Sequence, residues 1–509
     1  SVMSSVTNWG EVTGYDHTAN LTYTLPLDKF PLTDWITSNA NYGAGYQWDR
    51  APFTQDSLGA TIQNSQNLAL NTQVNFVNLY NKIPYLKRIN DKGKAAKGKG
   101  GKAPAKDDKG AGKDEKDKSG GKDEDKGAKI DPLEGFFRVL MSVRNGSLTY
   151  SQNSGVLLPG YGRTTNVIGM DNFEAPGWGF VLGQQNHDLT GDLVRDFATE
   201  AAGKDWLVRT PSIFNPYTNT RSETINARLT LEPFKSMRIE LQANRSYSNN
   251  RSSFFRWNND SARYVNDSPR EFGNFSVSTI TWLTAFSRDD DNFVSTIFQN
   301  MLADLPVISG RLGEGNPNSF EQPGSDFWYG YDTTSQDVII PAFYAAYTGT
   351  NAGKVRLDPF KTVPLPNWDI TYDGLTKLDL FKKFFRTFTV NHSYRSSFNL
   401  GSYQTNLLYD PDGSALDAGG NFIPSRQITV VTITEAMRPL INFDATLQNS
   451  LLTKFEYNRD RSISLSLSNN QITEVRGVEY VIGSGYRFKN VKFPFQIGGN
   501  TPKSDLNVR

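Results

Sequence analysis

The stretch RSISLSLSNNQITEVRGVEYVIGSGYRF, residues 461–488, decides the fold class. Isoleucine and leucine first alternate with serine, and after a polar gap the apolar residues again recur at every second position. In the first part, Ile463, Leu465 and Leu467 share one parity, whereas Ser464 and Ser466 fall on the other. In the second part, Tyr480 and Ile482 share the apolar parity. Strict alternation of this kind predicts a β-hairpin with one apolar face. The open question is whether that face contacts a protein core or lipid.

The same alternation recurs along the chain, in residues 20–25, 40–48, 67–76, 367–372 and 387–395. The clearest pair of predicted strands lies within residues 224–248 and is joined by a short turn at 232–236. Its apolar parity includes Leu229, Leu231, Ile239 and Leu241, and its polar parity includes Arg228, Arg238, Glu240, Gln242 and Asn244. We expect roughly 11 to 14 strands in total. Residues 457–461 are either a turn or the middle of one long strand.

Loop length separates the two all-β architectures that this pattern allows. Short links at 232–236 and 448–450 alternate with long connections at 151–222, 249–366 and 399–426. Short turns at one rim and long loops at the other are typical of a membrane β-barrel, whereas a sandwich uses uniformly short links. The aromatic residues Tyr46, Trp48, Trp368 and Tyr372 suit an interfacial belt. These features favour a membrane barrel, with a soluble β-protein as the alternative.

In a barrel, the polar parity lines the lumen and the apolar parity contacts lipid. The predicted lumen-lining residues are Arg228, Arg238, Glu240, Gln242, Asn244, Asn391, Arg395, Lys454, Glu456, Ser464 and Ser466. The predicted lipid-facing residues are Leu229, Leu231, Ile239, Leu241, Ile463, Leu465, Leu467, Tyr480 and Ile482. So many charges on one parity imply a wet interior, because unpaired charges in an apolar one would be prohibitive.

The long loops and one biased segment carry further signals. Helical spacing of apolar residues predicts one helix within 191–207, ended by Gly203, and another within 291–306, ended before Pro306. These helices are expected to form caps folded over or into the barrel mouth, or else a surface that docks a partner. Residues 92–129 are rich in Lys, Asp, Glu and Gly and predict a disordered tether at the short-turn rim. It is either a tolerated insertion or a site that holds a periplasmic partner.

The composition disfavours catalytic, metal-binding and nucleic-acid-binding sites. The chain has no cysteine, three scattered histidines and a net charge of +1, which disfavours thiolate sites, catalytic triads and nucleic-acid binding. The carboxylates at 289–291 and those of Asp410 and Asp412 are too few for a calcium loop. We therefore expect no enzyme activity, no cofactor and no metal. No apolar run is long enough for a transmembrane helix, and both ends of the sequence suggest a segment of a longer secreted or envelope protein.

Several long stretches, taken together, resemble a known family. They include NLYNKIPYLKRIN, LMSVRNGSLTYSQNSGVLLPGY, APGWGFVLGQQ, INARLTLEPFKSMRIELQANRS and FEYNRDRSISLSLSNNQITE, in that order. The chain resembles the C-terminal part of the SprA/Sov family, the outer-membrane translocon of the type IX secretion system. The resemblance implies a single-chain barrel of about 36 strands, of which this chain would supply roughly a third.

The resemblance also implies a function and a set of partners. The barrel would pass folded cargo proteins that carry a C-terminal secretion signal across the bacterial outer membrane. A small shuttle-type β-barrel and a plug protein would act at a lateral opening, together with periplasmic secretion components. Two alternatives remain open: another large outer-membrane barrel, such as a TonB-dependent transporter or an adhesin-like protein, and a soluble surface β-protein with binding loops.

The sequence therefore predicts an all-β chain that is a segment of a very large antiparallel transmembrane β-barrel with long helix-containing extracellular loops. Residues 1–90 are expected to hold transmembrane strands and a periplasmic turn, and residues 91–130 a disordered periplasmic insertion. Residues 131–250 would hold further strands around the long loop 151–222, and residues 251–366 a cap-like extracellular region. Residues 367–509 would complete the strands.

Overall fold

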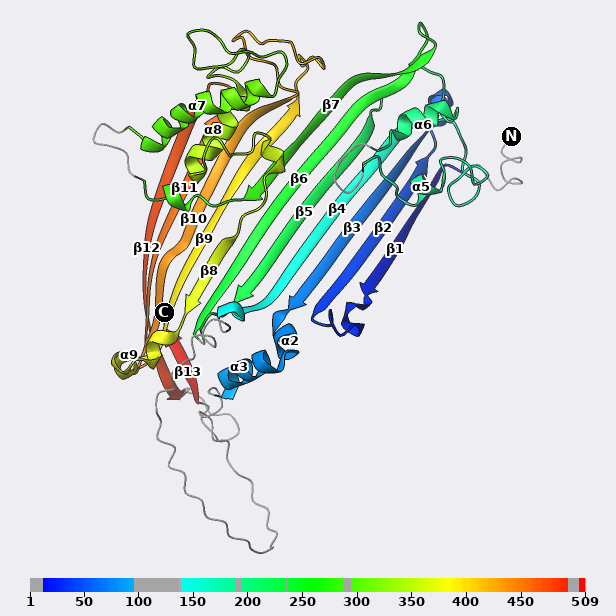
Figure 1. Cartoon of the computed structure of the whole chain (residues 1–509). Helices are drawn as coiled ribbons and strands as arrows, with labels where there is room; N and C mark the ends of the chain where they lie inside the picture. Colours follow the sequence, from blue (N-terminus) through cyan, green and yellow to red (C-terminus); the bar gives the residue numbers. More distant parts are fainter. Residues whose placement is uncertain are drawn as a thin grey trace, which may run out of the picture.

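The described residues of the chain form one large antiparallel sheet of 13 strands. The computed structural model describes residues 12–95, 137, 139–187, 194–234, 236–287, 294–492 and 503–508. The strands are β1 (Gly14–Leu25), β2 (Ile36–Asp49), β3 (Ala60–Asn75), β4 (Val143–Tyr161), β5 (Tyr217–Leu231), β6 (Met237–Asn258), β7 (Arg263–Ser278), β8 (Asn367–Tyr372), β9 (Phe385–Thr405), β10 (Arg426–Leu447), β11 (Leu451–Ser466), β12 (Gln471–Lys492) and β13 (Lys503–Val508). They run side by side at a common tilt, and the strand count lies within the predicted range (Figure 1).

The predicted hairpins are confirmed. β5 and β6 pair across the short link at 232–236, and β10 and β11 pair across the link at 448–450. β11 also pairs with β12, and in this hairpin Ser466 lies opposite Gln471. β11 runs without a break through residues 457–461, so the alternative of a turn there is wrong. On the parity of Ile463 and Leu465, β11 carries Arg459 and Arg461, so the apolar alternation is interrupted there although the strand continues.

One strand position in the sheet is shared by two strands. β7 pairs with the upper parts of β6 and β9, and β8 pairs with their lower parts, so β7 and β8 lie end to end between the same two neighbours. Residues 279–366 leave and re-enter the sheet at this point. We call the junction between Ser278 and Asn367 the seam.

Helices lie near both ends of the sheet. The α-helices are α2 (Phe76–Asn81), α3 (Pro84–Ala95), α5 (Trp178–Val181), α6 (Phe197–Gly203), α7 (Thr296–Glu314), α8 (Gln336–Thr348) and α9 (Asp379–Phe384). The 3-10 helices are η1 (Pro26–Lys29), η2 (Phe53–Leu58), η3 (Trp282–Thr284), η4 (Pro359–Lys361) and η5 (Gly374–Lys377). In Figure 1, α5 and α6 lie by the upper ends of β1–β4, α7 and α8 by the upper ends of β9–β11, and α2, α3 and α9 near the lower ends.

The long connections are shorter than predicted, because the strands extend further upward. The expected loop 151–222 spans only 162–216, since β4 continues to Tyr161 and β5 begins at Tyr217. The expected loop 249–366 contains the end of β6 and all of β7, and β9 continues to Thr405. These upper strand segments are rich in Ser, Asn and Arg, so they lack the apolar alternation that identified the lower segments.

The helices also differ from prediction. Pro306 lies inside α7, which continues to Glu314, and the apolar helix α8 was not predicted, because its residues are apolar on all sides and show no period. β3 ends at Asn75, whose side chain accepts a hydrogen bond from the Asn78 N–H and so starts α2. α3 extends to Ala95, into the predicted disordered segment 91–130; residues 96–130 lie outside the described residues.

Candidate membrane and lumen surfaces

The strand register assigns every strand residue to one of two faces. Leu229 lies opposite Leu241, and the adjacent pair, Arg228 and Gln242, points to the other side of the sheet. We call the side of Leu229 the apolar face and the side of Arg228 the polar face. Following the pairings from strand to strand extends both faces from β1 to β12.

The predicted site residues separate cleanly between these faces. All eleven polar residues lie on the polar face: Arg228, Arg238, Glu240, Gln242, Asn244, Asn391, Arg395, Lys454, Glu456, Ser464 and Ser466. Eight apolar residues lie on the apolar face: Leu229, Leu231, Ile239, Leu241, Ile463, Leu465, Tyr480 and Ile482. Leu467 follows the end of β11 and packs against the same buried cluster as Ile463 and Leu465.

The lower part of the apolar face is an uncharged surface that crosses the sheet. One row of paired residues runs through Ile36, Val74, Gly146, Leu229, Leu241, Trp368 and Tyr394. A second runs through Met237, Tyr372, Val390, Phe443, Phe455 and Ile482. We call the surface that these rows mark the apolar band. It is open to its surroundings at β12, where Ile482 is 81% and Tyr480 65% exposed.

The polar face presents the opposite chemistry at the same height. The row one residue away from the first apolar row runs through Thr37, Gln73, Ser147, Arg228 and Gln242. Charges on this face occur as mixed ion pairs, with 3.7 Å between Arg228 and Glu240, 3.5 Å between Arg395 and Asp369, and 2.6 Å between Lys454 and Glu456. The arginines remain largely exposed, so these pairs lie on a wetted surface and contribute little to stability.

Above the apolar band, the apolar face becomes charged and is covered by protein. Arg245 pairs with Glu223, and Arg461 pairs with Glu435 at 3.5 Å with both side chains almost fully buried. Arg461 also donates to the Thr284 carbonyl at 2.8 Å, and Arg459 donates to the Ala285 carbonyl at 2.7 Å. These bonds fasten η3 and its surroundings to β10 and β11 at the upper edge of the apolar band.

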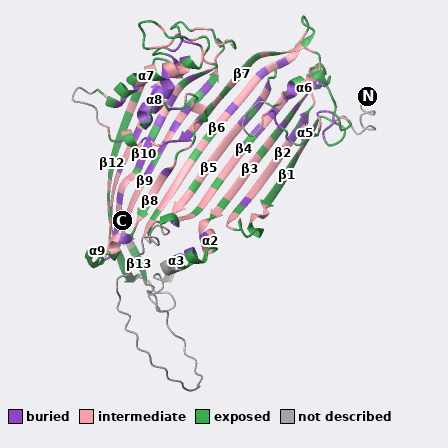
Figure 2. Ribbon diagram, in the orientation of Figure 1, coloured by how far each residue is buried: buried purple, intermediate pink, exposed green. Residues whose placement is uncertain are grey.

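Two protein caps cover the upper apolar face. The described residues of 162–216, with α5 and α6, bury Tyr46, Trp48 and Ile62. The described residues of 279–366, with α7 and α8, pack on Phe398, Ile433, Ile463 and Leu465, among others. Figure 2 shows buried residues gathered at this end of the sheet and intermediate exposure along the lower strands.

The position of the caps corrects three expectations. Ile463 and Leu465 are 0% and 1% exposed beneath α7 and α8, so they face protein and not lipid. Tyr46 and Trp48 belong to the core under α5 and are not interfacial aromatics, whereas Trp368 and Tyr372 do lie in the apolar band. The caps pack on the apolar face of the sheet and not on the polar face that was predicted to line a lumen. Alternation alone does not distinguish a face covered by lipid from one covered by helices.

An aromatic cluster lies on the apolar band beside the seam. Trp282 of η3 packs edge-on against His392 and Tyr394, with ring centroids 5.7 Å and 5.5 Å apart, and Trp368 stacks on Tyr394 at 4.3 Å. Trp282 was not predicted, because its place beside Trp368 depends on the seam.

The seam keeps the hydrogen-bond ladder satisfied where β7 gives way to β8. The Ser278 hydroxyl donates to the Leu365 carbonyl at 2.7 Å and accepts from the Asn244 N–H at 3.0 Å. The Asn367 side chain accepts from the Ser396 N–H at 3.0 Å and donates to its carbonyl at 3.2 Å. Side chains thus replace the missing main-chain partners, as a buried backbone requires.

One carboxyl in the second cap has a strongly shifted pKa. Burial of Asp337, in the first turn of α8, raises the pKa of its carboxyl to about 6. A hydrogen bond from Gln336 opposes this shift and the nearby charge of Asp358 adds to it. The α8 helix therefore carries an unfavourable, half-buried charge at neutral pH.

No family model and no curated protein matches the chain. Among the described residues, no helix is both long enough and apolar enough to cross a bilayer, and no group of three or more acidic or histidine side chains could hold a metal ion.

Proposed function

We propose that this sheet is a sector of the wall of a large outer-membrane β-barrel, and that the barrel conducts proteins in type IX secretion. The observation that carries the proposal is the pair of rows one residue apart, one uncharged across seven strands and the other polar throughout. Such a sheet fits a bilayer on one side and water on the other.

The length of the strands supports this placement. β6 has 22 residues, which at about 3.3 Å each extend much further than the 9 to 11 residues that cross a bilayer. On its apolar face, β6 has no charge between Met237 and Ala243, and the first charge is Arg245. The lower part of the strand thus suits the membrane, and the upper part, covered by the caps, would stand in the extracellular space.

The character of the polar face supports a wide, wet conduit. Small and uncharged polar residues dominate it, and many of its charges lie in mixed ion pairs. A wall of this kind offers no strong anchor to a passing polypeptide. A sheet of 13 strands already exceeds the number at which side chains can fill a barrel, so a closed barrel that contains it would hold water.

The partners follow from the resemblance to the SprA/Sov family. We include in the proposal cargo proteins with a C-terminal secretion signal, a small shuttle-type barrel, a plug protein and periplasmic secretion components. The outer membrane is the proposed location, and the proposed role is conduction and not catalysis.

Site-specific photo-crosslinking in secreting cells tests the function. A photoreactive amino acid at Asn244, on the polar face, should crosslink to cargo that carries the C-terminal signal. The same probe at Leu241, on the apolar face three residues away, should crosslink to no cargo and serves as the matched control. Cargo crosslinks at neither position, in cells that secrete normally, would contradict the proposed conduit.

A further inference from the structure

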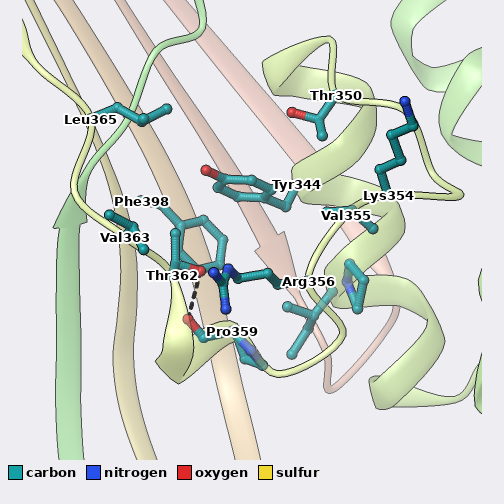
Figure 3. A pocket seen from close by; sticks show the side chains of 12 residues that line it. Tyr344, Thr350, Lys354, Val355, Arg356, Pro359, Thr362, Val363, Leu365 and Phe398 are labelled. Atoms are coloured by element: carbon teal, nitrogen blue, oxygen red, sulfur yellow. Dashed lines mark hydrogen bonds between the residues drawn. The ribbon is translucent and has the colours of Figure 1, made fainter.

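A groove with an apolar lining lies between α8 and the segment that leads from η4 back to the sheet. It has a volume of about 230 Å³. Its apolar lining includes Ile340, Tyr344, Val355, Val363, Leu365 and Phe398 (Figure 3). We call it the α8 groove. It lies on the apolar face, because Phe398 shares that face with Ile433 and Ile463.

Two cations stand at the α8 groove. Figure 3 shows Arg356 extending into the groove beside Phe398 and Lys354 at the rim near Thr350. No acidic residue lines the groove, and among the described residues neither cation has a carboxylate within ion-pair distance. Asp358, the nearest acidic residue along the chain, pairs with Lys361 at 3.8 Å. The groove therefore combines an apolar interior with an uncompensated positive charge.

The lower end of the α8 groove adjoins the apolar band. The Leu365 N–H donates to the Ser278 carbonyl at 2.9 Å, and the Ser278 hydroxyl donates back to the Leu365 carbonyl. Two residues after Leu365, the chain enters β8, and Trp368 belongs to the band. Leu365, in the groove lining, and Trp368, in the apolar band, are thus three residues apart along the chain.

We infer that the α8 groove binds an anionic lipid of the outer leaflet, with an acyl chain along the apolar lining and its phosphate near the cations Lys354 and Arg356. The inference rests on the proposed membrane location of the apolar band. The nearness of the groove to the band brings it within reach of an acyl chain, and the two cations match a phosphate in charge.

Such a lipid would tie the second cap to the membrane surface. α8 forms one wall of the groove, and the segment that re-enters the sheet at the seam forms the other. A ligand that contacts both walls stabilises their present arrangement, because it binds this arrangement and not one in which α8 has moved away.

Native mass spectrometry of the protein purified in detergent tests the inference. The probes are dioleoyl phosphatidic acid, dioleoylglycerol, inorganic phosphate and a soluble acidic peptide. Dioleoylglycerol has the same acyl chains without the phosphate, and inorganic phosphate has no acyl chain. We expect phosphatidic acid to bind at least tenfold more tightly than the other three. The double substitution K354A/R356A should weaken phosphatidic acid at least tenfold, whereas the control K361A, on the same loop but paired to Asp358, should change its affinity less than twofold.

A second variant keeps the test independent of charge. Val363→Trp would fill the α8 groove at a residue that is 56% exposed, and it should also weaken phosphatidic acid. Unchanged affinity in both variants, or equal binding of dioleoylglycerol or of the peptide, would overturn the inference. Labelling of cysteines placed in β6, in the same variants, reports on the apolar band separately. Loss of the lipid-binding proposal can therefore be distinguished from loss of the proposed membrane location.

Discussion

A charge placed at Leu241 would measure directly what the apolar band contacts. On the apolar face of β6, Leu241 lies four residues from Met237, where the strand begins, and four from Arg245, the first charge above the band. At about 3.3 Å per residue it is roughly 13 Å along the strand from either limit, which places it near the middle of the bilayer. Leu241→Arg should therefore destabilise the protein by about 2–4 kcal/mol, the range for arginine near the midplane of a barrel wall.

The matched control is Asn244→Arg, on the polar face of the same strand and largely exposed. It introduces the same side chain into water and should change the free energy of unfolding by less than about 0.5 kcal/mol. The assay is urea unfolding of both variants reconstituted in phospholipid vesicles, followed by tryptophan fluorescence. Equal stability of the two variants would refute the membrane assignment, because an arginine on a wetted face costs little at either position.

Three further predictions concern the caps and the band. Glu435→Ala leaves the buried Arg461 without its carboxylate and should destabilise the attachment of η3 by about 3–5 kcal/mol, seen as faster proteolysis after Trp282. Asp337→Asn removes a carboxyl whose pKa is raised to about 6, and it should stabilise the second cap by about 1–3 kcal/mol at pH 7.5. At pH 3.5 the carboxyl is largely protonated in both the folded and the unfolded form, so the substitution should change the stability by almost nothing. Thermal unfolding at the two pH values checks this difference. Ile463→Ala should cost about 2–5 kcal/mol in urea unfolding because it opens a cavity under α7 and α8, whereas Ile482→Ala, on the exposed band, should cost less than half as much.

The sign of the Asp337 prediction follows from the direction of its shift. A carboxyl with a raised folded-state pKa contributes its full stability below its unfolded-state value of 3.8, and this contribution is lost as the pH rises through about 6. Asparagine does not titrate, so the difference between the variant and the wild type should grow over that interval. A constant difference from pH 3.5 to 7.5 would show that Asp337 does not titrate in the expected range.

The faces of the sheet could be predicted from the sequence, because side-chain direction in a strand follows from parity alone. In residues 224–244, the alternation of Leu229 with Arg228 was enough to assign both faces, and the short link at 232–236 fixed the pairing. The same logic assigned Ile463 to the correct face. It did not show that α7 and α8 cover this residue, because lipid and a helix favour the same apolar side chains.

The seam and the α8 helix could not be predicted, for two different reasons. β7 and β8 share one strand position only because each pairs with β6 and β9, and no local pattern near Ser278 or Asn367 encodes that arrangement. α8 is apolar on every side because it is enclosed by α7 and the sheet, so it has no helical period to detect.

Cysteine accessibility along β6 tests the central claim most directly, since the chain contains no cysteine of its own. Single cysteines at positions 237–244 would be labelled, in intact membranes, with a water-soluble maleimide and separately with a lipid-phase reagent. We predict that positions 238, 240, 242 and 244 react with the maleimide alone and that positions 237, 239, 241 and 243 react with the lipid-phase reagent alone. Odd positions that react with neither reagent, or with the maleimide, would contradict the account, because the band would then be covered by protein or by water.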